Sequence, residues 1–127
     1  MGQETLPEIV IVREQEHIGP GELIRLVDLF FTDMVKIVVD LNKRVVAVGG
    51  ELHADAEQLL LQEGSQQRDL WGANYYPGES QGACIEYTSL INIRPSQDNH
   101  SMEIADPEIR RSIMEIVFER IGKGRDP

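Results

Sequence analysis

Side chains that could bind a ligand or transfer a proton are concentrated in residues 49–57, Gly-Gly-Glu-Leu-His-Ala-Asp-Ala-Glu. In an extended chain Glu51, His53 and Asp55 would share one side, because side chains alternate along a strand. In a helix His53 would share a face with Glu57, four residues later. Either arrangement places an imidazole beside carboxylates, which can bind a divalent metal or tune a general base. Glu51, His53 and Asp55 are therefore candidate catalytic residues or metal ligands, and the identity of any cofactor stays open.

A structural interpretation of the same segment is also open. Asp55 would be the N-cap of a helix, and His53 would hydrogen-bond to the backbone. Gly49 and Gly50 would let the chain turn from a strand into this helix. His-x-Asp is a weaker metal motif than His-Glu-x-x-His, and no Gly-Lys-Ser/Thr follows the glycine pair as it would in a phosphate-binding loop.

A second polar group lies in residues 92–101, Asn-Ile-Arg-Pro-Ser-Gln-Asp-Asn-His-Ser. Asn92 and Arg94 would share a strand face, and the loop that follows supplies Ser96 and Gln97. An arginine surrounded by amides and hydroxyls can hold a carboxylate or a phosphate. We therefore expect these four residues to bind a polar or anionic ligand. In the alternative, Arg94 pairs with an acidic side chain and the loop caps its own backbone.

A third segment, residues 70–77, contains the sole tryptophan of the chain. Trp71 would line a pocket or belong to the core, which is the more usual place for a large aromatic side chain. Asn74 is unexpected in a strand and could face the second polar group across the sheet. We expect Trp71 and Asn74 to form walls of a ligand site. Cys84 and Ser89 have no activating neighbour in the sequence, so covalent catalysis is not favoured.

Hydrophobic periodicity and turn residues predict the elements that would position these groups. Strands are expected at 9–12, 35–40, 45–48, 70–76 and 85–94, and helices at 21–31, 55–62 and 107–121. The order βαββαββα favours a single two-layer α+β domain over residues 1–127, with an ordered core at about 9–121. Its sheet would be mainly antiparallel, with about five strands, and would carry three helices. Asn42 and Lys43 would form a hairpin turn, since Asn tolerates positive φ.

The helix predicted at 21–31 has a narrow polar stripe. Only Arg25 and Asp28 interrupt its apolar residues after Glu22. So apolar a helix is either deeply buried or covered by a partner chain. We therefore expect a homo-oligomer, most simply a two-fold dimer.

Composition excludes several classes of function. The chain has 127 residues, 41% of them hydrophobic and 27% charged, which is typical of one soluble domain. Its net charge of −10, without a Lys/Arg cluster, argues against sequence-independent binding to nucleic acid. No apolar run is long enough to span a membrane. One cysteine excludes an internal disulfide and fits a reducing, cytoplasmic location.

Three motifs resemble a family of uncharacterised bacterial proteins, a domain of unknown function. They are Gly-Gly-Glu-Leu-His-Ala-Asp-Ala-Glu at 49–57, Leu-Trp-Gly-x-Asn-x-Tyr-Pro at 70–77 and Ser-Leu-Ile-Asn-Ile-Arg-Pro-Ser-Gln at 89–97. The likeness covers about residues 9–121. It implies a small stand-alone domain and transfers no catalytic residue, because the family has no assigned activity.

Two functions follow from the sequence. In the first, the domain binds a small polar or anionic ligand or a metal ion, with hydrolysis of the ligand as a further option. In the second, it is a homo-oligomeric interaction or regulatory module without catalytic activity. The two functions are compatible, and whether the protein is an enzyme stays open.

Overall fold

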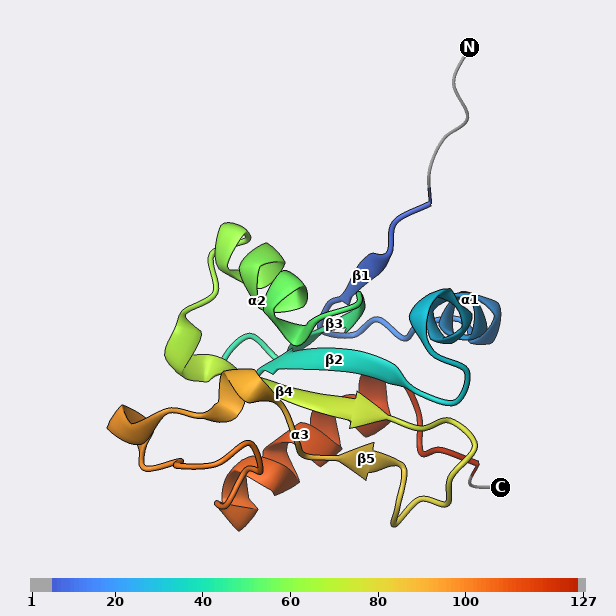
Figure 1. The fold of residues 1–127 in the computed structure, drawn as a ribbon. Helices are drawn as coiled ribbons and strands as arrows, with labels where there is room; N and C mark the ends of the chain where they lie inside the picture. Colours follow the sequence, from blue (N-terminus) through green and yellow to red (C-terminus); the bar gives the residue numbers. More distant parts are fainter. Residues whose placement is uncertain (1–5, 126–127) are drawn as a thin grey trace.

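Five antiparallel strands form one open sheet in the order β1-β3-β2-β4-β5 (Figure 1). The computed structural model describes residues 6–125. The strands are β1 (Ile9–Val12), β2 (Val35–Asp40), β3 (Val45–Gly49), β4 (Leu70–Tyr75) and β5 (Ile85–Glu86). The helices are α1 (Pro20–Phe30), α2 (His53–Gln62) and α3 (Pro107–Arg120), and three short 3-10 turns are η1 (Gln67–Asp69), η2 (Leu90–Asn92) and η3 (Pro95–Gln97). The predicted α+β class and element order are confirmed.

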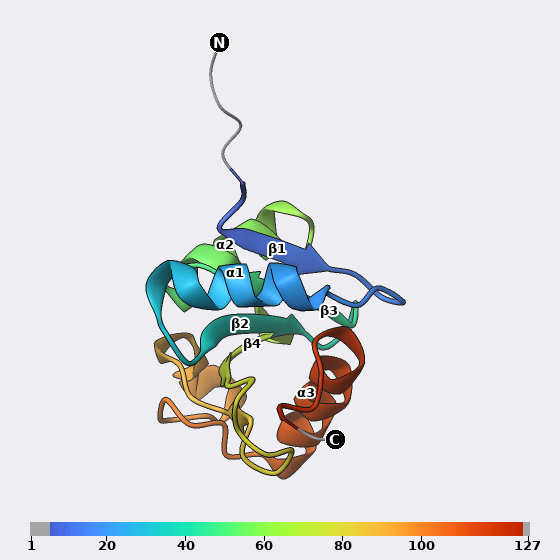
Figure 2. The same ribbon diagram turned by 90° about the vertical axis from the view of Figure 1, so that its right-hand side faces the viewer.

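Helices cover both faces of the sheet, so the domain has three layers where two were expected. Alternate residues of each strand point to opposite faces. Ile37, Val39 and Trp71 belong to the core formed with α1 and α3. Val38 and Leu70 belong to a smaller core formed with α2. Figure 2 shows α1 in front of the sheet and α2 behind it.

The loop between β2 and β3 is organised by the last residue of β2. One carboxylate oxygen of Asp40, Oδ1, accepts hydrogen bonds from the backbone N–H groups of Asn42 and Lys43, each at 2.9 Å. The turn is therefore where the sequence predicted it. Its positive φ, however, is at Arg44 (58°) and not at Asn42. Because Asp40 binds the N–H groups at the start of the turn, the left-handed residue falls at its end.

The turn between β3 and α2 confirms the structural role of the glycine pair. Gly49 and Gly50 have φ values of 111° and 91°, a region that favours glycine. A Cβ on Gly49 would collide with the carbonyl oxygen of Glu8, the residue just before β1. The expected N-cap at Asp55 is wrong: α2 begins two residues earlier, with Leu52 at the N-cap and no side-chain capping bond. Near the other end of the chain, α3 begins at residue 107 as predicted, with Asp106 at its N-cap.

The long strand predicted at 85–94 is wrong. Strand β5 ends at Glu86, and the chain then folds over β4 through the turn η2. The close approach depends on Gly72, because a Cβ there would lie 2.6 Å from Cβ of Ser89. The side chains do not alternate as expected, either: Asn92 and Arg94 are buried, whereas Leu90 is 73% exposed.

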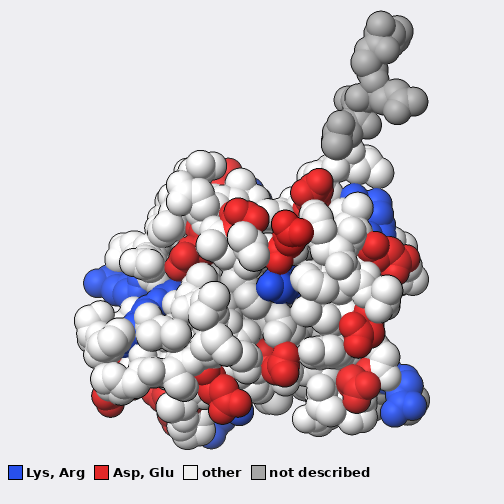
Figure 3. Space-filling view, in the orientation of Figure 1, with Lys and Arg blue, Asp and Glu red and all other residues white. Residues whose placement is uncertain are grey.

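The surface carries scattered charge of both signs. Figure 3 shows acidic side chains spread over the visible face, with no continuous basic patch on that face. Between residues 6 and 125, no helix is both long and apolar enough to cross a membrane.

Candidate functional site

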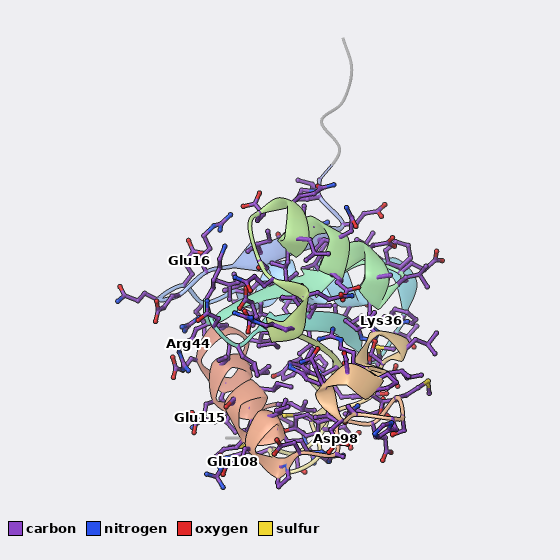
Figure 4. All side chains as sticks on the ribbon, turned by 90° about the vertical axis from the view of Figure 1, so that its left-hand side faces the viewer. Glu16, Lys36, Arg44, Asp98, Glu108 and Glu115 are labelled. Atoms are coloured by element: carbon purple, nitrogen blue, oxygen red, sulfur yellow. The ribbon has the colours of Figure 1, made fainter. Side chains whose placement is uncertain are left out.

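A pocket of about 320 Å³ lies on the α2 side of the sheet, between the first residues of α2 and the segment around η2. Its volume is in the range of small-molecule sites. Figure 4 views this side of the molecule, and the labelled Lys36 lies between α2 and the chain around η2. The pocket is lined by Lys36, Leu52, His53, Ala54, Asn74, Thr88, Ser89, Leu90, Ile91 and Met102.

Two neighbouring strands and the start of a helix bring three polar side chains to this pocket. Lys36 on β2 and Asn74 on β4 are directly opposite each other in the antiparallel register. His53 is the first residue of α2. Its Nε2 lies 2.7 Å from the carbonyl oxygen of Ala73, which holds the imidazole over β4. The alternative in which His53 hydrogen-bonds to the backbone is therefore confirmed.

The bond to Ala73 also fixes the protonation pattern of the His53 ring. A carbonyl oxygen only accepts hydrogen bonds, so Nε2 carries the hydrogen. Burial lowers the pKa of His53 below its usual 6.5, and the charge of Lys36 lowers it further. The hydrogen bond to the backbone of Ala73 and a hydrogen bond with the side chain of Asn74 each raise the pKa in part. Because the net shift is downward, the ring is neutral near pH 7 and Nδ1 is an acceptor.

Asn74 has a buried acceptor without a partner. Its Nδ2 donates to Oε1 of Glu86 at 2.8 Å, and since a carboxylate only accepts, this bond fixes the orientation of the amide. Oδ1 is then a buried oxygen to which no described group donates while His53 is neutral; a protonated ring could donate to it, and this hydrogen bond is how Asn74 raises the pKa of His53. Asn74 as a whole is 8% exposed. Buried polar atoms of this kind are uncommon in folded proteins and indicate a missing partner.

The pocket also carries positive charge. Lys36 forms no ion pair with any of the described residues, and its Nζ lies 5.5 Å from the centroid of the Phe31 ring. The first residues of α2 line the pocket, and no side chain caps this helix end. Free N–H groups at a helix N-terminus favour negative charge.

Apolar side chains form most of the remaining wall and the rim. Leu52, Leu90 and Met102 are 53%, 73% and 42% exposed, which is unusual for large apolar residues gathered at one place. An apolar pocket with a few convergent polar groups is the usual form of a small-molecule site.

Arg94, expected to hold an anion, is bound within the protein. Its guanidinium donates to the carbonyl oxygens of Ile91 at 3.0 Å and Gln67 at 2.7 Å, and it pairs with Glu57 at 3.3 Å. It also lies 4.8 Å from the centroid of the Trp71 ring. Burial lowers the pKa of Arg94, and the adjacent carboxylate of Glu57 opposes that shift. The alternative in which Arg94 pairs with an acid is therefore confirmed, and the geometry favours a structural role.

The other residues expected to bind a ligand with Arg94 are hydrogen-bonded to the backbone, buried in the core or exposed. The amide of Asn92 is fully buried and pairs with the backbone of Gly72. Gln97 Nε2 donates to the carbonyl oxygen of Arg68, and Ser96 is exposed. Trp71 is 1% exposed and belongs to the core on the opposite face of the sheet.

Glu51 and Asp55 are exposed, whereas His53 between them is buried. Across residues 6–125, no group of three His, Cys, Asp or Glu side chains could hold a metal ion. The interpretation of Glu51, His53 and Asp55 as metal ligands therefore has no ligand set in this part of the chain. The physical reason is that the helix begins at His53, which turns the three side chains in different directions.

Sequence reasoning missed Lys36, Leu90 and Met102 as pocket residues. A signal was available for Lys36, which interrupts the apolar run Val-Lys-Ile-Val-Val at 35–39. A charged residue inside a buried strand needs either a partner or an opening to solvent. No comparable signal marks Leu90 and Met102, because their position depends on the irregular path after β5.

Fold and site together define a small α+β domain with an amphiphilic pocket on the α2 side of its sheet. The chain belongs to a family described as "Protein of unknown function (DUF5674)", whose family model matches residues 10–120. Searches of curated proteins and of solved structures each found no match.

Proposed function

We propose that this domain binds a small organic molecule in the pocket at the start of α2. The observation that carries the proposal is the buried, unpartnered Oδ1 of Asn74 in a pocket that also contains Lys36 without an ion pair. Among the described residues, the only other buried side-chain atom without a partner is Nε of Arg25, on α1. A ligand that donates to Asn74 and carries negative charge beside Lys36 would supply the partners that these two pocket residues lack.

Binding without hydrolysis is the function that the geometry supports. Ser89 lines the same pocket as His53, but its Oγ accepts a hydrogen bond from the N–H of Ile91 at 3.2 Å. No hydrogen bond joins this hydroxyl to the imidazole, so the two do not form a nucleophile–base pair. No carboxylate is among the lining residues of the pocket.

The test is a fragment screen by NMR with a variant that fills the pocket. Ala54 lines the pocket and is exposed, so Ala54→Trp should occupy the space without disturbing the core. Gln58→Trp, on an exposed position of the same helix, is the matched control. Fragments should shift the amide signals of residues 52–54, 74 and 88–91 in the wild type and in Gln58→Trp. Hits that persist in Ala54→Trp, or a screen without hits, would overturn the proposal.

Self-association through α1 is a second candidate function. Leu23, Leu26 and Val27 are buried in the core of the domain, which accounts for much of the apolar character of this helix. Ile24 and Leu29, however, are 60% and 43% exposed. If this surface forms a dimer, light scattering will give twice the mass of the chain, 14.3 kDa, and Leu29→Glu will reduce it to that of a monomer. A wild-type mass of 14.3 kDa at high micromolar concentration would contradict this candidate.

A further inference from the structure

The positive charge of the pocket indicates that its ligand carries negative charge. The chain contains 22 acidic residues, and yet no Asp or Glu lines this pocket to neutralise Lys36. The uncapped beginning of α2 adds partial positive charge from the same direction, because Leu52, His53 and Ala54 line the pocket as well. Both features favour a negative group on the ligand.

The amount of positive charge indicates a monoanion. Sites for phosphate dianions usually combine several cationic or N–H donors. Here Lys36 is the one cationic side chain among the lining residues, since His53 is neutral. A carboxylate needs less compensation than a phosphate, and an apolar wall of Leu52, Leu90 and Met102 accommodates a hydrocarbon chain attached to it.

An acceptor next to Lys36 requires a donor from the ligand. Asn74 Oδ1 has no partner, and its amide is polarised because Nδ2 donates to the carboxylate of Glu86. Lys36 and Asn74 are directly opposite in the β2–β4 register, so their Cβ atoms are about 5 Å apart. A ligand that carries its donor on the carbon next to its carboxylate can reach both side chains from one position.

We propose that the pocket recognises a small carboxylate that carries a hydroxyl or amino group on C2 and an apolar chain. The carboxylate pairs with Lys36 at the start of α2, the C2 substituent donates to Asn74, and the chain lies against the apolar wall. This inference rests on the proposed function of the pocket as a small-molecule site.

The experiment compares four probes of one carbon skeleton. They are 4-methylpentanoate, its 2-hydroxy and 2-amino derivatives, and the neutral 4-methylpentanamide, each titrated by NMR up to about 10 mM, which detects millimolar Kd values. At least one C2-substituted acid should bind about tenfold more tightly than the unsubstituted acid, and the amide about tenfold more weakly. Comparison of the 2-hydroxy and 2-amino acids shows which of the two groups is the preferred donor.

Two variants separate the contributions. Lys36→Gln should weaken the acids about tenfold and leave the amide unchanged, whereas Lys43→Gln, an exposed lysine outside the pocket, should leave all four unchanged. Asn74→Leu should remove the advantage of the C2 substituent and retain the unsubstituted acid. If Asn74→Leu does not fold, the probe series and Lys36→Gln decide the question.

Several results would overturn the inference. An amide that binds as tightly as the acids, or acids insensitive to Lys36→Gln, would refute a carboxylate ligand while leaving the proposed pocket function intact. Acids that bind without preference for the C2 donor would refute the role of Asn74. If no probe shifts the signals of residues 52–54, 74 and 88–91, the ligand class is wrong, and the proposed function is then judged by its own fragment screen.

Discussion

The side-chain amide of Asn92 pairs with both backbone groups of Gly72. Oδ1 accepts from the N–H of Gly72 and Nδ2 donates to its carbonyl oxygen, each at 2.9 Å. Strand β5 pairs only with residues 74 and 75 of β4, so this amide takes the place of a neighbouring strand at position 72. An Asn that completes a sheet in this way is no longer available to a ligand, which explains why its polar character misled the sequence interpretation.

Removing this amide should destabilise the domain. In Asn92→Ala the N–H and carbonyl of Gly72, both buried at this strand, lose their partners. We expect the free energy of unfolding to fall by about 2–3 kcal/mol. Urea denaturation measures the loss, with the exposed Asn42→Ala as a control for the substitution itself. A loss below about 0.5 kcal/mol, the level of surface substitutions, would show that water replaces the amide at no cost.

Arg94→Ala should also destabilise the domain, in contrast to the unchanged melting temperature expected of a ligand-binding arginine. The side chains of Arg94 and Glu57 are 8% and 13% exposed, so the substitution leaves a largely buried carboxylate without its partner. The expected cost is about 3 kcal/mol. The exposed Arg111→Ala is the matched control. A melting temperature equal to that of the wild type would return Arg94 to the list of candidate ligand-binding residues.

The close packing of the η2 segment on β4 predicts intolerance at one glycine. In Gly72→Ala the new Cβ would lie 2.6 Å from Cβ and 2.7 Å from Oγ of Ser89, which forces the segment away from the sheet. We expect a loss of about 1–3 kcal/mol and shifted amide signals at residues 88–91. Gly78→Ala is a control, because a Cβ there meets nothing within 4 Å. Equal stability of the two variants would contradict the packing argument.

The lowered pKa of His53 predicts a pH dependence of stability. The unfolded state, with an ordinary pKa of 6.5, binds a proton more readily than the folded state. This contribution to stability is therefore fully present above pH 6.5 and decreases as the pH falls through the folded pKa, below 6.5. Between pH 8 and pH 5 the wild type should lose more stability than His53→Gln, as measured by urea denaturation at each pH. Parallel profiles for the two proteins would contradict the downward shift.

Most of the helices and strands were predicted correctly, because the patterns that indicate them lie within the elements themselves. The β-branched runs at 9–12 and 35–40 became strands with those bounds, and the helix predicted from residue 107 begins there. The strand at 85–94 failed for a long-range reason. Its alternating apolar residues are typical of a strand, but the chain leaves the sheet where it can pack against Gly72, and no pattern within 85–94 contains that information.

The candidate site was predictable only in part for the same reason. His53 and Asn74 line the pocket, but Arg94 and Asn92, equally polar in the sequence, are used inside the protein. Residue type does not distinguish a side chain that binds a ligand from one that replaces a strand. Lys36 could have been noticed as a charge in an apolar run. That it lies opposite Asn74 follows from the β2–β4 register, which the sequence alone does not reveal.

The Asn92–Gly72 pairing also determines how this part of the domain fluctuates. Because a side chain closes the edge of β4 at this position, the η2 segment can detach while the pairing of β2 with β4 stays intact. The N–H of Gly72 would then exchange with solvent deuterium faster than the amides of the central strands. The exchange rate of this N–H therefore measures how often one wall of the pocket opens. A molecule bound in the pocket would lower that exchange rate.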